Sequence, residues 1–119
     1  MTATESFLAT VAQRALCRWP TIVNTYDLAS DCIHRGVVGD FVECGVYNGS
    51  HPAAMWRALA DVGGADDECR TIHLFDSFAG IPRGGPDDGP DITDLVGKAD
   101  GAVITSSGVS VCSRANVEA

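Results

Sequence analysis

An acidic residue followed by two spaced glycines constrains this chain more than any other feature. Residues 37–46 form a short apolar run that is typical of a β-strand. Glu43 lies near the end of this run, and Gly45 and Gly49 follow it in an acidic-x-Gly-x-x-x-Gly pattern. Glycine permits a sharp backbone turn and lets a ligand approach because it has no Cβ. The pattern therefore predicts a ligand-binding turn between a strand and a helix.

The residues after this turn predict a βαβ unit. Residues 52–62 have helical character, with Pro52 suited to the first turn and Ser50 or His51 as the capping residue. Residues 65–70 form a charged connection, and a second apolar strand is expected over residues 71–75. Strand, helix and strand in this order favour two neighbouring parallel strands.

Two helices are expected before the first strand. Apolar residues recur at helical spacing within residues 4–18, and Trp19-Pro20 should end that helix because a residue before proline avoids helical angles. A second helix is expected from about Thr21 or Asn24 to Arg35, and Gly36 suits its left-handed end. The predicted organisation is a helical segment over residues 1–36 and an α/β domain over residues 37–119.

The last third of the chain has a different character. Residues 79–100 are rich in Gly, Pro and Asp and predict a loop. Its acidic residues are expected to be solvated turn residues rather than metal ligands; they are Asp87, Asp88, Asp91 and Asp94. Residues 113–119 have the pattern of a beginning helix.

Charge and cysteine content exclude several classes of protein. The 119 residues carry a net charge of -8, which argues against nucleic acid and anionic membrane as partners. Five cysteines without a C-x-x-C pair fit neither a disulfide framework nor a zinc site, so we expect reduced and mostly buried thiols. No apolar stretch is long enough to cross a bilayer. These features favour a cytoplasmic protein.

The strand ends indicate what the turn binds. The helix after the turn offers free N–H groups to an anionic group. Glu43 is expected near a cationic or amino group, and Asp76 closes the second strand where a carboxylate can hold a ribose hydroxyl pair. Tyr47 stands where a dinucleotide-binding turn carries its middle glycine, so a pyrophosphate would meet a bulky side chain. The pattern favours a cofactor that has an amino acid and a ribose but no phosphate.

Two motifs resemble the macrocin O-methyltransferase family. The first is Gly39-Asp40-Phe41-Val42-Glu43-Cys44-Gly45-Val46 with Gly49, and the second is Phe75-Asp76-Ser77-Phe78-Ala79-Gly80-Ile81-Pro82. The resemblance runs from about Tyr26 to Pro82, with a weaker echo over residues 109–118. It implies a class I methyltransferase fold, S-adenosylmethionine as methyl donor, and a small-molecule acceptor such as a hydroxyl of a sugar or natural product. It also implies Mg²⁺ dependence, with carboxylate ligands in later strands that have no counterpart here.

The same resemblance implies which residues bind the cofactor. They are Glu43, Gly45, Val46, Tyr47, Asn48, Gly49, Ser50, Asp76, Ser77 and Phe78. No catalytic residue and no metal ligand is assigned. For His51 and His73, structural roles are favoured over a role as general base, because no partner is evident in the sequence.

The expected fold is an incomplete one. The sequence predicts an α/β protein with N-terminal helices and the first βαβ unit of a doubly wound, Rossmann-like parallel sheet, so residues 37–119 form a truncated S-adenosylmethionine-binding domain. A homo-oligomer or a missing C-terminal half would cover the open sheet edge. Three functions stay open: the cofactor-binding half of an O-methyltransferase, a non-catalytic fragment or interaction module derived from such an enzyme, and, less favoured, a nucleotide-sugar or NAD-binding unit.

Overall fold

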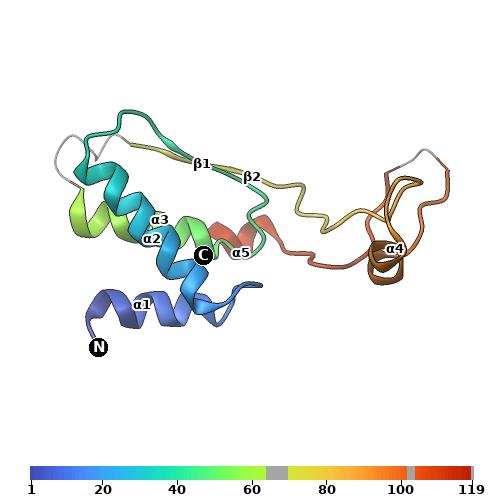
Figure 1. Ribbon diagram of the computed structural model, residues 1–119, viewed down its shortest axis with the longest axis horizontal. Coiled ribbons are helices and arrows are strands. Elements are labelled where there is room, and N and C mark those ends of the chain that lie inside the picture. The colour runs from blue at the N-terminus through green and yellow to red at the C-terminus, as the bar shows by residue number, and fades with distance from the viewer. Residues whose placement is uncertain (64–69, 102–103, 119) are drawn as a thin grey trace. The chain divides into compact units, whose positions relative to one another are not determined.

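Two compact units make up the chain (Figure 1). The computed structural model describes residues 1–63, 70–101 and 104–118. The first unit is Met1–Asp76 and the second is Ser77–Ala119. The expected domain boundary after residue 36 stays a prediction, and most of the charged connection expected over residues 65–70 lies outside the described residues.

The first unit is a small α/β structure. Its elements are α1 (Ala3–Ala12), α2 (Trp19–His34), β1 (Phe41–Cys44), α3 (Ser50–Val62) and β2 (Ile72–Phe75). The two strands pair in parallel, in a register that runs from Phe41 opposite Ile72 to Cys44 opposite Phe75. The predicted strand–helix–strand order with parallel pairing is therefore confirmed.

The junction between the first two helices differs from the prediction. α1 ends at Ala12 rather than at residue 18, and Trp19-Pro20 begins α2 instead of ending α1. Proline fits the first turn of a helix because the N–H that it lacks would have no partner within the helix. At the other end of α2, Gly36 has a φ of 64° after the last helical turn, which confirms the predicted left-handed end.

Both strands are shorter than the apolar runs that predicted them. Gly39 and Gly45 have φ values of 121° and 93°, so extended backbone cannot continue on either side of β1. Asp40 fastens the start of the sheet: its carboxylate accepts a hydrogen bond from the Thr71 amide at 3.0 Å and lies 2.8 Å from the His73 ring. Polar side chains therefore fix the register where β1 and β2 begin.

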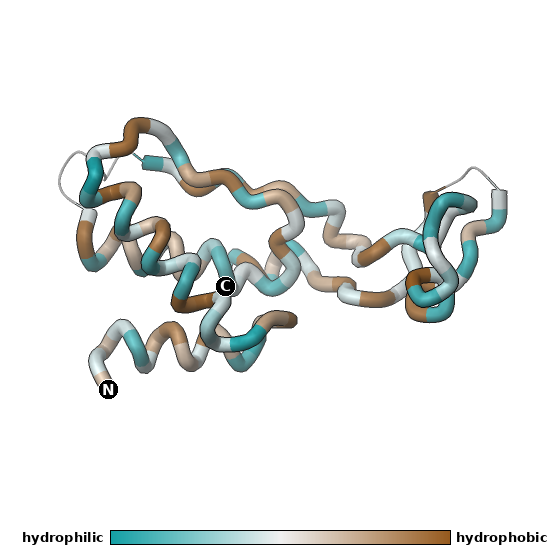
Figure 2. Tube along the Cα trace, in the orientation of Figure 1, coloured by the Kyte–Doolittle hydropathy of each residue, from teal (hydrophilic) through white to brown (hydrophobic). Residues whose placement is uncertain are grey.

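Helices cover one face of the strand pair (Figure 1). Phe41 on β1 packs against a buried cluster from α2 and α3, made of Ala29, Ile33 and Ala58. The opposite face is bare: Val42 is 57% exposed and Phe75 is 59% exposed. Figure 2 shows hydrophobic residues along both strands.

The exposure of the cysteines depends on this arrangement. The four that the structure describes are free thiols, as predicted. The expectation that most of them are buried is wrong, because Cys112 is buried but Cys44 is exposed and Cys17 and Cys32 are half-buried. Cys44 alternates with Glu43 along β1 and so lies on the bare face of the sheet. Cys69 lies outside the described residues.

Small residues on α3 let the three helices pack closely. Ala54 and Ala58 are fully buried. Leu8 of α1 and Ile22 of α2 meet Ala54 in one cluster. None of the helices in the described parts of the chain is long and apolar enough to cross a membrane.

The second unit contains a helix where the sequence predicts a loop. α4 (Pro90–Val96) lies within residues 79–100 and buries Val96, with Pro90 in its first turn. The sequence predicted a loop here because glycines and prolines surround this short helix. The acidic residues of the segment are exposed, as predicted. α5 (Arg114–Glu118) confirms the helix expected near the end of the chain.

One carboxylate ties α1, α2 and α3 together. Asp61 on α3 accepts hydrogen bonds from Thr4 at 2.6 Å, Tyr26 at 3.1 Å and the Arg57 Nε at 3.0 Å. Burial by itself would raise the pKa of Asp61, but the hydrogen bonds from Arg57, Thr4 and Tyr26 hold it below the ordinary value of 3.8. The folded state therefore prefers the ionised carboxylate.

We expect Asp61→Asn to lower the free energy of unfolding by about 2 kcal/mol at pH 7, because the charge-assisted hydrogen bonds are lost. A folded-state pKa below the unfolded value stabilises the fold at pH above about 4, and this contribution is lost as the pH falls through the folded-state pKa. Urea unfolding at pH 7 and at pH 3 measures both effects.

Asp31→Asn is the matched control, because Asp31 forms an exposed pair with Arg35 at 3.3 Å and should change stability by less than about 0.5 kcal/mol. Equal losses in the two variants, or an Asp61→Asn loss that does not shrink at pH 3, would contradict the assignment.

Candidate functional site

The turn between β1 and α3 has an unusual backbone. Gly45, Tyr47 and Gly49 have φ values of 93°, 49° and 77°. A positive φ is rare for a residue with a side chain, so Tyr47 is held there by its surroundings. Apart from Gly45 itself and its two chain neighbours, no atom of the described residues lies within 4 Å of the point that a Cβ on Gly45 would occupy. Gly45 is therefore required by its backbone angle, and the space beside it is open.

Gly49 is the N-cap residue of α3, so the prediction of Ser50 or His51 in that role is wrong. The Ser50 hydroxyl is buried and donates instead to the carbonyl of Val11, at 3.3 Å. Within the described parts of the chain, no side-chain hydrogen bond caps the first N–H groups of α3.

Asp76 holds the turn in place. Its Oδ2 accepts hydrogen bonds from the amides of Val46 at 2.7 Å and Tyr47 at 2.9 Å. The contact arises because parallel strands bring their carboxyl ends to one edge of a sheet, so the residue after β2 meets the residues after β1. The expected contact between Asp76 and a ribose stays a prediction. The structure shows a second role for Asp76, which is to hold the backbone of the turn.

Glu43 is the electrostatically perturbed group of the site. It is half-buried on the sheet face that carries Phe41, and its Oε2 is buried without a hydrogen-bond partner among the described residues. Burial and the negative charge of Asp76 together raise the pKa of Glu43 from 4.5 to about 7. A cationic group beside these two carboxyl groups would favour the ionised form of Glu43.

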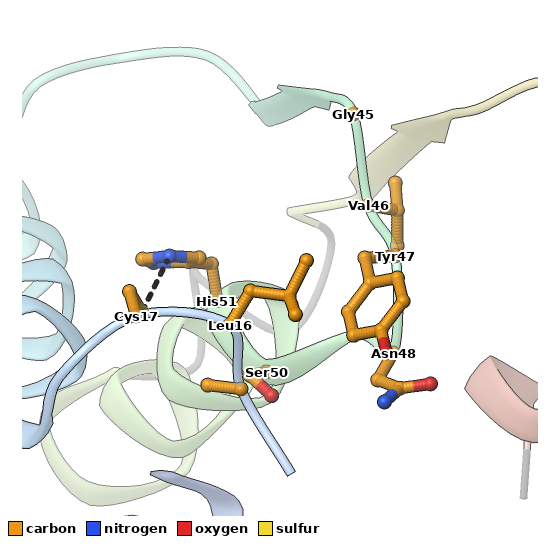
Figure 3. A pocket seen from close by; sticks show the side chains of 9 residues that line it. Leu16, Cys17, Gly45, Val46, Tyr47, Asn48, Ser50 and His51 are labelled. Carbon is orange, nitrogen blue, oxygen red and sulfur yellow. Dashed lines mark hydrogen bonds between the residues drawn. The ribbon is translucent and has the colours of Figure 1, made fainter. Parts of the chain in front are cut away.

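A pocket of about 240 Å³ opens beside the turn (Figure 3). Its wall includes five of the residues that the sequence predicts to bind a cofactor: Gly45, Val46, Tyr47, Asn48 and Ser50. The segment before α2 supplies Ala15, Leu16 and Cys17, and α3 supplies His51.

The structure brings most of the predicted site residues together. Glu43 to Ser50 form one continuous segment, and Asp76 joins it through the turn amides. Asn48 also has a structural contact, because its side-chain amide donates to the carbonyl of Arg14 at 3.0 Å. Ser77 and Phe78 belong to the second unit.

Sequence reasoning missed the partners of the two histidines. His51 contacts Thr25 and Cys17, and His73 contacts Asp40. These partners are far apart in the chain, so no local spacing reveals them. Among the residues described, no three His, Cys, Asp or Glu side chains gather as a metal-binding group would.

Comparison with known proteins finds a matching family. Residues 21–111 match the family described as macrocin-O-methyltransferase (TylF), and this matched range extends beyond the two motifs at both ends. No curated protein and no solved structure matches the chain at a significant level.

We expect Asp76→Ala to lower the free energy of unfolding by about 2 kcal/mol, because two turn amides lose a charged acceptor. Urea unfolding should be measured at pH 6, where most of Glu43 is protonated and relief of repulsion between the two carboxylates offsets little of the loss. Asp76→Asn retains an acceptor and should lose less. A loss below about 0.5 kcal/mol in Asp76→Ala would show that the turn does not depend on this carboxylate.

Glu43→Gln should stabilise the ligand-free protein at pH 8. A carboxyl group with a raised folded-state pKa destabilises the fold increasingly as the pH rises from about 4.5 to 7, and the full penalty is present above that window. A change of one in pKa corresponds to about 1.4 kcal/mol, so for this half-buried group we expect a gain of about 1–3 kcal/mol. Thermal unfolding at pH 8 and pH 4 measures it, and the gain should vanish at pH 4. A gain of equal size at both pH values would mean that charge burial is not its cause.

Proposed function

Because this chain belongs to the macrocin-O-methyltransferase family, we propose that it takes part in O-methyl transfer from S-adenosylmethionine to a hydroxyl group of a sugar or other natural product. In this proposal the first unit is the beginning of a Rossmann-like class I methyltransferase fold. It supplies the cofactor-binding part, and the family match over residues 21–111 is its main support.

The observation that carries the cofactor assignment is the buried Oε2 of Glu43, which has no hydrogen-bond partner among the described residues. A buried carboxylate oxygen without a partner is costly, and it is normally satisfied by a ligand or water. S-adenosylmethionine is cationic at its amino group and at its sulfur. Its amino group placed against Glu43 would supply the missing partner and offset the repulsion from Asp76.

The other residues of the turn would position the same ligand. The cofactor's carboxylate would face the uncapped N–H groups at the start of α3, where the helix dipole favours negative charge. Asp76 would keep the turn in place through Val46 and Tyr47 while its carboxyl group faces the ribose hydroxyls. The open space beside Gly45 would admit the ligand backbone.

When bound, the cofactor supplies an electrophilic methyl group on its sulfur. The protein residues named here bind and orient it, and such positioning contributes much of the rate in a transfer of this kind. We assign no residue to the deprotonation of the acceptor hydroxyl. We likewise assign no ligands for Mg²⁺, because the described residues hold no group of three candidate ligands.

Calorimetric titration with S-adenosylhomocysteine tests the proposal. We expect saturable binding that Glu43→Gln weakens about tenfold, because a charged hydrogen bond is lost. The same variant should be more stable without ligand, so weaker binding cannot be attributed to unfolding. Asp27→Asn changes an exposed acidic residue on α2 and is the matched control, with unchanged affinity.

The pH dependence of the same titration gives a second test of the role of Glu43. Binding of a cation requires ionised Glu43, so affinity should rise about tenfold between pH 6 and pH 8 in the wild type and stay level in Glu43→Gln. Absence of saturable binding by a chain that circular dichroism shows to be folded would favour the non-catalytic alternative. Tight binding of NADH would contradict the methyltransferase assignment.

A further inference from the structure

Three side chains from separate segments of the first unit form a chain of contacts. The Thr25 hydroxyl on α2 lies 2.7 Å from Nδ1 of His51, which is on the first turn of α3. Nε2 of the same ring lies 3.5 Å from Sγ of Cys17, in the segment before α2. Figure 3 shows the Cys17 thiol next to the His51 ring at the edge of the pocket.

Hydrogen-bond directions along this chain depend on the tautomer of His51. The Thr25 hydroxyl also lies 3.2 Å from the carbonyl oxygen of Thr21, to which it can donate. In the tautomer that carries its proton on Nδ1, the His51 ring donates to the Thr25 oxygen, and the lone pair of Nε2 faces the Cys17 thiol. A thiol, a base and a third group that orients the base make the arrangement of an activated nucleophile.

The surroundings of the thiol admit a small uncharged molecule. Cys17 and His51 both line the pocket of about 240 Å³, so the thiol is accessible from it. That volume is below the roughly 300–1,000 Å³ of pockets that hold drug-sized ligands. Apart from His51, the described residues of the wall are apolar or neutral. The occupant that fits is a low-molecular-weight, neutral reagent.

We propose that Cys17, activated by His51, is a modification site that undergoes exchange with low-molecular-weight disulfides. His51 Nε2 takes the proton of the thiol, and the Cys17 thiolate attacks one sulfur of the disulfide. A new S–S bond to Cys17 forms as the original S–S bond breaks. The departing thiolate receives the proton from His51, so the products are a mixed disulfide on Cys17 and one free small thiol. Thr25 is a positioning residue, because it holds the ring with Nε2 toward the thiol.

The test uses the full chain and the neutral reagent bis(2-hydroxyethyl) disulfide. Mass spectrometry of peptides from quenched samples follows each cysteine separately. At pH 7 we expect Cys17 to react at least about tenfold faster than Cys44, although Cys44 is the more exposed thiol. Equal rates at the two cysteines would overturn the proposal.

Two variants test the roles of the partners. His51→Gln should lower the rate at Cys17 about tenfold or more. Thr25→Val removes the orienting hydroxyl and should cause a smaller loss of the same kind. The rate at Cys44 is the internal reference in each sample and should not change. An unchanged Cys17 rate in His51→Gln would show that the contact is only structural, and the wild-type ratio of the Cys17 and Cys44 rates decides the question if that variant fails to fold.

The pocket links this site to the turn, because Gly45 to Asn48 form part of the same wall. This link rests on the proposed function: saturating S-adenosylhomocysteine should slow modification of Cys17 and leave Cys44 unaffected. Fast Cys17 modification without protection would count against the placement of the cofactor and leave the thiol site standing. If S-adenosylhomocysteine protects Cys17 but Cys17 reacts no faster than Cys44, the placement of the cofactor is supported and the thiol site is overturned.

Discussion

The hydrogen bonds from the Val46 and Tyr47 amides to Asp76 are the contact on which the site depends. They require parallel pairing of β1 and β2, since only then do both strand ends reach the same edge. They also hold a backbone that adopts positive φ at three places within five residues, which the turn would not keep by itself. The orientation of the turn, and with it the start of α3, follows from this one carboxylate.

The same contact creates an electrostatic conflict. Holding Asp76 at the turn places its charge near Glu43, whose carboxyl group is already half-buried and has an oxygen without a partner in the part of the chain that the structure describes. An arrangement that served stability alone would replace Glu43 with a neutral residue. Retaining an ionisable group with a pKa near 7 there is typical of binding and catalytic sites, where a ligand relieves the conflict. This is the physical basis for the proposal that Glu43 faces a cationic cofactor.

Close helix packing explains why a second group of reactive side chains lies beside the turn. Ala54 and Ala58 bring α3 against α2, and this approach places the ring of His51 within reach of Thr25. The segment that joins α1 to α2 then passes over the start of α3 and adds Cys17. One pocket is therefore shared by the turn and the thiol, so chemistry at either site bears on the other.

The sequence by itself determined the local elements: the strand that contains Glu43, the glycine turn after it, a helix over residues 52–62 and the parallel strand that ends before Asp76. These depend on residue type and short-range spacing, which can be read directly. It also placed the chain in its family, through motifs at the two strand ends. It could not reveal that α1 stops at Ala12, that α4 forms in a Gly- and Pro-rich segment, or that Asp76 supports the turn. Tertiary structure alone decided the raised pKa of Glu43 and the partners of His51, because burial and contacts between distant segments arise only when the helices close over the sheet.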